Sequence, residues 1–174
     1  MKNLRFKNTG VTLTEVMATM TIIGLITSTA VPMFGDMIEN SRVTAAAEGL
    51  YAELQLARSE AIKSNSNKHL SVTNGTAWCY GVDVNAACNC DPTATTAVCP
   101  TKSSSITGVS LTSNTPVQDG IYLAPNGGVF DNTNTAVNGL ITFSGENGKS
   151  ISVILKSLGQ VSLCSSSVSG YQSC

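Results

Sequence analysis

The residues of this sequence with the clearest chemistry are six cysteines, all beyond residue 78: Cys79, Cys88, Cys90, Cys99, Cys164 and Cys174. An even number of cysteines in an exported chain indicates disulfides, and six cysteines allow fifteen pairings. We predict a bond between Cys164 and Cys174, which closes a short C-terminal loop. The partners of the other four cysteines are left open. Zinc is not expected, because Cys88 and Cys90 lack the usual two-residue gap and the chain has one histidine.

Patterns that would indicate an enzyme are weak. The single histidine, His69, lies in a strand-like segment and is expected to be structural. The glycines of Asn126-Gly127-Gly128 have no Walker or dinucleotide pattern around them and indicate a turn. Asp131 to Asn134 is rich in oxygen atoms but lacks the spaced ligands and closing glutamate of a calcium loop, so it indicates a polar turn. We expect no catalytic residue, no cofactor and no metal.

A single acid, Glu15, interrupts the beginning of an apolar run that continues to Pro32. A carboxylate within an apolar span costs roughly 2.5 to 3.5 kcal/mol on insertion scales, so such an acid is expected to have a partner and a role. The alternative is a secretory signal peptide over residues 1–30, with a positive start and small residues at 28–30 as the cleavage site. That alternative gives Glu15 neither partner nor role.

The segment Gly10-Val11-Thr12-Leu13-Thr14-Glu15 resembles the class III signal of type IV pilins and type II secretion pseudopilins. The resemblance implies that prepilin peptidase cuts after Gly10, that Val11 becomes a methylated N-terminus, and that Glu15 stands fifth in the mature chain. Val11 and Thr14 depart from the usual phenylalanine and aliphatic residue. In an assembling filament, Glu15 would pair with the terminal ammonium of a neighbouring subunit, which fixes axial register more than it adds stability.

The helix that positions this motif is expected to run from Val11 to about Ser64, interrupted only at Pro32 and Gly35. Proline lacks an amide hydrogen, so we expect a kink or local melting there, with Gly35 adding flexibility. Residues 11–31 supply about 20 residues, the length that a bilayer core requires. The predicted organisation is therefore a leader (1–10), a helix (11–64) whose part 11–31 is transmembrane and later forms the filament core, and a periplasmic β-rich domain (65–174).

Beyond Pro32 the predicted helix carries one apolar stripe, with alternating four- and three-residue spacing: Val43, Ala47, Leu50, Leu54, Ala57 and Ala61. This period is typical of an amphipathic helix. Its expected partner is the chain's own β-domain, because three alanines give a free coiled coil little to bury.

After residue 67 the sequence shows short β-type runs separated by turn residues. We predict strands at 69–73, 77–84, 106–111, 121–123, 129–130, 140–143, 151–155 and 160–163, with asparagine–glycine turns at 74–75, 126–128 and 147–148. Residues 85–105 are predicted to be a loop held by disulfides. The expected fold class is α+β: a long N-terminal helix packed on an antiparallel β-sandwich.

The end of the predicted helix, Leu54-Gln-Leu-Ala-Arg58-Ser-Glu-Ala-Ile62, resembles the signature of the GspH/FimT branch of minor pilins and pseudopilins. Ala124-Pro-Asn-Gly127 and Ser157-Leu-Gly159-Gln160 follow in the order of that branch. The resemblance implies a non-catalytic minor pilin that helps initiate pilus assembly, first in the inner membrane and then in the fibre at the cell surface. Its implied partners are major and minor pilins and prepilin peptidase. A type II secretion pseudopilin is the alternative.

One group within this branch binds DNA through a motif of Gly-Arg-x-Arg type, so a DNA receptor is a further alternative. The corresponding residues here are Gly159-Gln160-Val161-Ser162, without the two arginines that would contact phosphate. Loss of the leader would also lower the formal net charge of −1 by three, since three basic residues leave with it. DNA is therefore not an expected partner.

Overall fold

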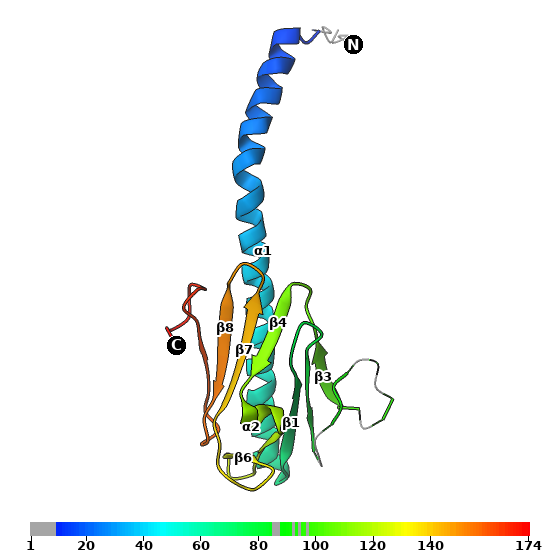
Figure 1. Cartoon of the computed structure of the whole chain (residues 1–174), viewed down its shortest axis with the longest axis vertical. Helices are drawn as coiled ribbons and strands as arrows, with labels where there is room; N and C mark the ends of the chain where they lie inside the picture. Colours follow the sequence, from blue (N-terminus) through cyan, green and yellow to red (C-terminus); the bar gives the residue numbers. More distant parts are fainter. Residues whose placement is uncertain (1–9, 85–87, 92, 94, 97) are drawn as a thin grey trace, which may run out of the picture. The chain divides into compact units, whose positions relative to one another are not determined.

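The computed structural model describes residues 10–84, 88–91, 93, 95, 96 and 98–174, with the side chains at 29–33, 101 and 102 outside the description. The chain divides into two compact units, residues 1–37 and 38–174. Helix α1 (Leu13–Ser64) begins in the first unit and ends in the second, which also holds the short helix α2 (Thr115–Gln118) and the strands (Figure 1). The unit boundary therefore lies inside the long helix.

Helix α1 is continuous across Pro32 and Gly35 in its backbone. Of the two outcomes expected at Pro32, local melting does not occur, and a kink there stays a prediction. In the first unit the helix is apolar on all sides, and its large side chains are exposed within the chain, among them Met17, Met20 and Leu25. A helix of this composition is normally covered by other apolar groups.

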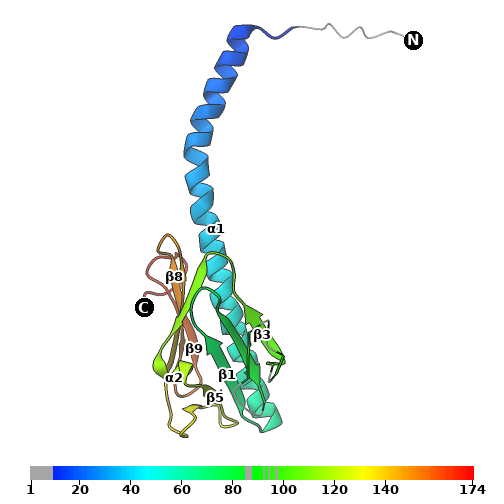
Figure 2. The same cartoon turned by 45° about the vertical axis from the view of Figure 1, so that its right-hand side comes forward.

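The apolar stripe of the second half of α1 packs on the chain's own β-domain, which confirms the prediction. All six predicted positions are buried: Val43, Ala47, Leu50, Leu54, Ala57 and Ala61. They share one core with side chains of both sheets, including Trp78, Phe143 and Leu155. Figures 1 and 2 show the two sheets arranged around this part of the helix.

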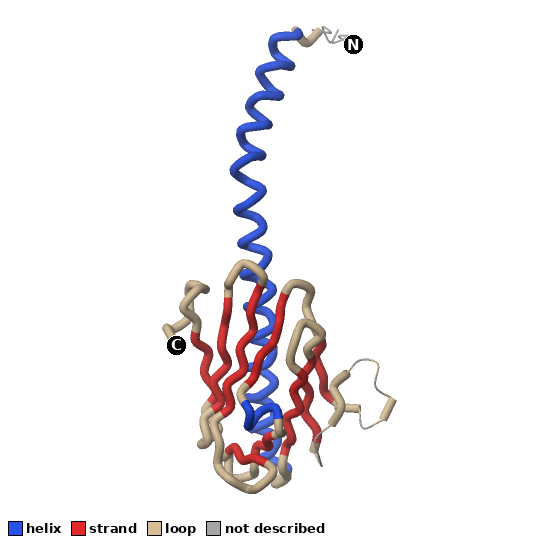
Figure 3. Tube along the Cα trace, viewed as in Figure 1, coloured by secondary structure: helices blue, strands red, loops and turns tan. Residues whose placement is uncertain are grey.

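Two antiparallel sheets form the β-domain. The first has the order β3-β2-β1-β5-β6 and consists of β3 (Thr101–Ser104), β2 (Cys79–Asp83), β1 (Lys68–Thr73), β5 (Ile121–Leu123) and β6 (Val129–Asp131). The second has the order β4-β7-β8-β9 and consists of β4 (Val109–Ser113), β7 (Gly139–Gly145), β8 (Ser150–Leu155) and β9 (Val161–Cys164). The fold class is thus α+β, with a long helix packed on antiparallel sheets. The strands are short and joined by loops at both ends (Figure 3).

Each of the eight predicted strands overlaps an observed one, with differences at the ends. The largest concerns β4, which begins at Val109 and not at Ile106, because Ile106 to Val109 forms a turn closed by Val109 N–H and Ile106 O at 3.1 Å. Within that turn Gly108 has a φ of 78°. The predicted turns contain Gly75, Gly127 and Gly148, all with positive φ, the conformation for which glycine carries no steric penalty.

Two elements were not expected. Strand β3 lies inside the segment 85–105 that the sequence predicted to be a loop, so that prediction is wrong for residues 101–104. It lies at the edge of its sheet beside β2, and an edge strand needs no apolar alternation to be held by backbone hydrogen bonds. Helix α2 has four residues, too few for a periodic signal.

Candidate functional site

The segment predicted to direct processing and assembly lies at the start of α1. Thr12 precedes the first helical residue, and its Oγ1 accepts a hydrogen bond from the backbone N–H of Glu15 at 3.3 Å. Threonine followed three residues later by glutamate is the pattern of a capping box, in which the first residue caps the helix. The spacing of these two residues would have revealed the cap from the sequence. It places the Glu15 carboxylate in the first turn, where the helix dipole favours a negative charge.

Gly10 and Val11 are exposed and precede the helix. Peptidase cleavage after Gly10 and methylation of Val11 stay predictions, as does the assembly role of Glu15. The geometry is compatible with all three, because the cleavage site lies outside regular structure and the Glu15 side chain is exposed.

Hydroxyl groups in the first unit form hydrogen bonds to the backbone of their own helix. Thr19, Thr21 and Thr27 donate to the carbonyls of Val16, Met17 and Ile23 at 2.7–2.9 Å. In a membrane helix such bonds satisfy hydroxyls that have no water. In the described part of the chain, no helix has a stretch whose length and hydropathy meet those of a membrane span.

The helix-end signature attaches α1 to two turns of the β-domain through Arg58. Its Nη2 donates to the carbonyl of Leu158 at 3.4 Å. The Arg58 guanidinium also lies against Gly127 and Gly159. A Cβ added to Gly127 would lie 3.4 Å from Nη2, and a Cβ added to Gly159 would lie 2.9 Å from Nε. The three sequence segments that resemble the GspH/FimT branch therefore meet at one place.

The two turns beneath Arg58 touch each other. A Cβ on Gly159 would lie 1.9 Å from the backbone oxygen of Gly127, and Gly159 has a φ of 73°. Only glycine fits such an approach without backbone movement. Arg58 Nε is buried and has no hydrogen-bond partner among the described residues. The guanidinium therefore contributes to this contact through its packing as well as through its charge.

A second attachment joins α1 to the turn between β7 and β8. Glu39 is 7% exposed. Its Oε1 accepts the backbone N–H of Asn147 at 2.8 Å, and its Oε2 accepts the Asn147 side-chain amide at 2.7 Å. Gly145 leaves room for this carboxylate, since a Cβ there would lie 2.1 Å from Glu39 Oε1. Sequence reasoning missed Glu39 because its partners are 108 residues away.

Further polar contacts hold the helix to the domain. Glu60 forms an ion pair with Lys68 at 3.0 Å, and Tyr171 donates a hydrogen bond to Glu48 at 2.7 Å. Partial burial, and then the nearby charge of Glu60, raise the pKa of Glu53. The helix thus contacts the first strand through Glu60 and the C-terminal loop through Glu48.

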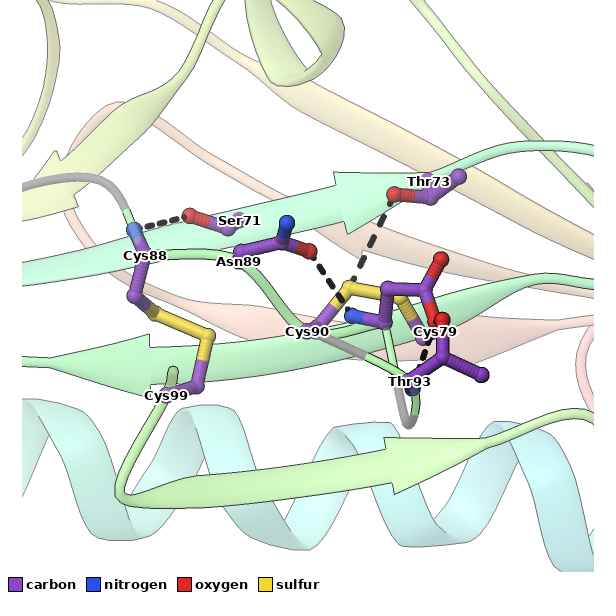
Figure 4. The surroundings of a disulfide bond; sticks show 9 residues. Ser71, Thr73, Cys79, Cys88, Asn89, Cys90, Thr93 and Cys99 are labelled. Atoms are coloured by element: carbon purple, nitrogen blue, oxygen red, sulfur yellow. Dashed lines mark hydrogen bonds between the residues drawn. A yellow bond between two sulfur atoms is a disulfide. The ribbon is translucent and has the colours of Figure 1, made fainter. Parts of the chain in front are cut away.

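Three disulfides staple the β-domain. The predicted pair Cys164–Cys174 is bonded and holds the C-terminal loop beside β9, where Ser165 N–H donates to Gln172 O at 2.8 Å. The pairs that the sequence left open are Cys79–Cys90 and Cys88–Cys99. Both lie where the segment after β2 crosses the first sheet (Figure 4).

The residues considered for catalysis or metal binding have structural surroundings. The ring of His69 lies 5.4 Å from that of Tyr122, and partial burial lowers the pKa of His69, against an opposing effect of Asp83. Asp131 Oδ1 accepts bonds from the backbone N–H groups of Thr133 and Thr135 and from the Thr133 hydroxyl at 2.7–2.9 Å. These bonds form the polar turn that was expected. No group of three or more potential ligands for a metal occurs within the described residues.

Solved structures that match this arrangement of helix and sheets include a minor pilin and a minor pseudopilin. The type IV minor pilin FimU of Pseudomonas aeruginosa matches in two crystal forms. One has a TM-score of 0.54 at 18% identity, covering 73% of this chain and 91% of that one, and the other has 0.51 at 20%, covering 69% and 90%. The minor pseudopilin EpsH of the Vibrio cholerae type 2 secretion system matches with a TM-score of 0.52 at 14% identity, covering 71% and 97%.

This chain therefore shares its fold with these minor pilins and this pseudopilin. Residues 46–159 match the family model described as type II transport protein GspH. Because this match spans more than half of the chain, the chain belongs to the GspH family and is a minor pilin or pseudopilin of that type. No curated protein sequence matches it.

Proposed function

We propose that this chain is a minor subunit of a type IV pilus that takes part in initiating fibre assembly. The observation that carries the proposal is the position of Glu15. It is the only charged residue between Val11 and Gly35, and it lies in the first turn of a helix whose other end is fixed to the β-domain. A single acid at the free end of an apolar helix has the placement that pairing with a neighbouring subunit requires.

The mature chain begins at Val11 in this proposal, after prepilin peptidase removes residues 1–10. Its terminal ammonium and the Glu15 carboxylate of a neighbour then lie in an apolar environment, where an unpaired charge is strongly penalised. The penalty favours one axial register of the incoming helix. The partners are therefore other pilins, major and minor, contacted through the first half of α1.

Before assembly, the first half of α1 anchors the chain in the inner membrane, with the β-domain in the periplasm. Two features support this location. The apolar side chains of this segment are exposed all around the helix, and its threonines bond to their own backbone. Assembly then moves the helix from lipid into the core of the fibre, and the subunit reaches the cell surface.

The Glu15→Ala variant tests this proposal. Export and cleavage are expected to be intact, while recovery of the variant in sheared surface fibres falls strongly. The Asp36→Ala variant, which removes an exposed carboxylate farther along the same helix, should assemble normally. Normal recovery of Glu15→Ala in the fibres would overturn the proposed role.

A type II secretion pseudopilin is the second candidate. The family description and the match to EpsH favour it as much as the match to FimU favours a pilus. Deletion of the gene separates the two. Loss of surface fibres with normal protein secretion supports a pilus subunit, whereas loss of secretion with normal fibres supports a pseudopilin.

A DNA-binding minor pilin is the third reading, and we do not favour it. Gln160 and Ser162 occupy the positions of the two arginines, and the arginine nearest to them, Arg58, packs against Gly159. Gel retardation of double-stranded DNA by the purified protein at low salt tests this reading. Slower migration of the DNA in the presence of the protein would support it.

A further inference from the structure

The two disulfides of the first sheet cross along the sequence. Cys79 bonds to Cys90, and Cys88 bonds to Cys99, so each bond encloses one cysteine of the other. All four cysteines are buried and form a cluster separate from the main core. Oxidation in chain order gives a different pattern, in which Cys79 bonds to Cys88 and Cys90 bonds to Cys99.

Distance along the chain does not select the crossed pattern. Cys88 is two residues closer to Cys79 than Cys90 is. A difference of two residues changes the free energy of closing such a loop by well under RT, and it favours the shorter loop. An unfolded chain that emerges from its N-terminus also exposes Cys88 before Cys90. The crossed pattern must therefore be selected by structure.

The β1–β2 hairpin provides that selection. Its register places Thr73 opposite Cys79, and the sulfur of Cys90 lies 3.7 Å from Thr73 Oγ1. Ser71, two residues earlier on β1, accepts the backbone N–H of Cys88 at 2.9 Å. Cys88 thus lies beside Ser71 and Cys90 beside Thr73, so the two cysteines have the same two-residue spacing as the β1 residues that they contact (Figure 4). Cys90, and not Cys88, meets Cys79 once the hairpin has formed.

The second bond is positioned by the segment itself. Cys99 N–H donates to the carbonyl of Asn89 at 3.1 Å, and Asn89 forms a parallel bridge with Val98. This pairing places Cys99 beside Cys88. Because the hairpin assigns Cys90 to Cys79, Cys88 and Cys99 also remain as the second pair among these four cysteines.

We infer that the crossed pair matures by thiol–disulfide exchange on the folded hairpin, and that the chain is a substrate of a disulfide isomerase, a protein with a reactive cysteine thiolate. Oxidation before the hairpin forms leaves the consecutive pairs. Formation of each of those bonds removes two electrons and two protons from two thiols and transfers them to a disulfide oxidant, which becomes a dithiol. The subsequent rearrangement has no net oxidation.

The rearrangement requires three successive attacks by thiolates on disulfide bonds. The isomerase thiolate attacks the sulfur of Cys88 in the Cys79–Cys88 bond, which forms a mixed disulfide and releases the Cys79 thiolate. That thiolate attacks Cys90 in the Cys90–Cys99 bond, which forms Cys79–Cys90 and releases the Cys99 thiolate. The Cys99 thiolate then attacks Cys88 in the mixed disulfide, which forms Cys88–Cys99 and returns the isomerase thiolate.

Refolding of the full-length chain in detergent tests this inference. The reduced chain is oxidised in denaturant with diamide until no thiol remains, and is then returned to native buffer with or without a purified disulfide isomerase. Bond positions are read by partial reduction at acidic pH, cyanylation and cleavage at the modified cysteines, which separates Cys88 from Cys90. The readout is the share of chains with the crossed pair.

The six cysteines of the full-length chain allow fifteen pairings, and one of them contains both crossed bonds, so without isomerase random pairing puts crossed pairs in roughly one chain in fifteen. With isomerase we expect a rise of about tenfold, to most of the chains. Two results would overturn the inference: crossed pairs in most chains before any thiol is added, or a share that isomerase leaves unchanged.

A pair of variants tests the role of the hairpin. Ser71→Ala with Thr73→Val removes the two hydroxyls that contact Cys88 and Cys90, and conversion is expected to slow by about fivefold, the effect of one net hydrogen bond. Thr142→Val with Ser152→Ala is the control, because it removes a hydroxyl pair 2.9 Å apart in the other sheet. Equal conversion rates in the two variants would contradict templating by β1.

Discussion

Arg58 near the end of the long helix packs against Gly159 in the turn before β9, with a distance of 2.9 Å from its Nε to the place where a Cβ on Gly159 would lie. The same guanidinium lies against Gly127. The helix-end signature and the two β-turn motifs thus belong to one contact. It holds the helix to the domain at the end opposite Glu15.

Substitution of Gly159 by alanine should disrupt this contact. The new Cβ would meet the Gly127 oxygen at 1.9 Å in a residue with positive φ, so we expect a loss of about 3 kcal/mol in the free energy of unfolding. Urea unfolding followed by the fluorescence of Trp78, the single tryptophan, measures it. Gly170→Ala is the matched control, because Gly170 has a φ of 98° with open space around it. It should lose only about 1 kcal/mol.

Removal of the Glu39 carboxylate should loosen the second attachment. Glu39→Ala leaves the N–H and amide of Asn147 without their charged acceptor, and hydrogen bonds to charged groups contribute about 2 kcal/mol. The same unfolding experiment measures the loss. Asp36→Ala removes an exposed carboxylate three residues earlier and should change stability by less than about 0.5 kcal/mol. Equal effects of the two variants would contradict the assignment.

Glu53→Gln should stabilise the protein at neutral pH. The pKa of Glu53 is raised in the folded state from an ordinary value of 4.5, so its protonated form is favoured by folding. The stability that it contributes is present below pH 4.5 and is lost as the pH rises through the folded pKa. The glutamine variant escapes that loss, and the gain is less than about 0.5 kcal/mol because the group is partly exposed. A gain that persists unchanged at pH below 4.5 would contradict this explanation.

The Cys164–Cys174 bond should stabilise the C-terminal loop. Replacement of both cysteines by serine frees the loop and is expected to cost about 2–3 kcal/mol, the value for a loop of this length. Ser166→Ala, an exposed change within the same loop, is the control. A double variant as stable as the control would show that the loop is held by its other contacts, such as Tyr171 to Glu48.

The parts of the fold that the sequence predicted are those set by local periodicity. The helical stripe from Val43 to Ala61 and the short strands follow from spacing alone. The Cys164–Cys174 pair follows from its short loop. By contrast, the crossed disulfides could not be predicted, because the competing loops differ by two residues and only the β1–β2 register separates them.

Long-range polar contacts could not be predicted from the sequence either. Glu39 resembles any helix acid until Asn147 is placed beside it. Strand β3 is polar because it lies at a sheet edge, so its sequence resembles a loop. Arg58 was visible as part of a family-like signature, but its role depends on two turns that are far away in the chain.

The central claim is that Glu15 lies in a mature helix that begins at Val11 and enters a surface fibre. Mass spectrometry of protein from sheared surface fibres tests it most directly. Our account predicts this chain in the fibre fraction with a methylated Val11 at its N-terminus. A chain that begins at Val31 and is found soluble in the periplasm would contradict it.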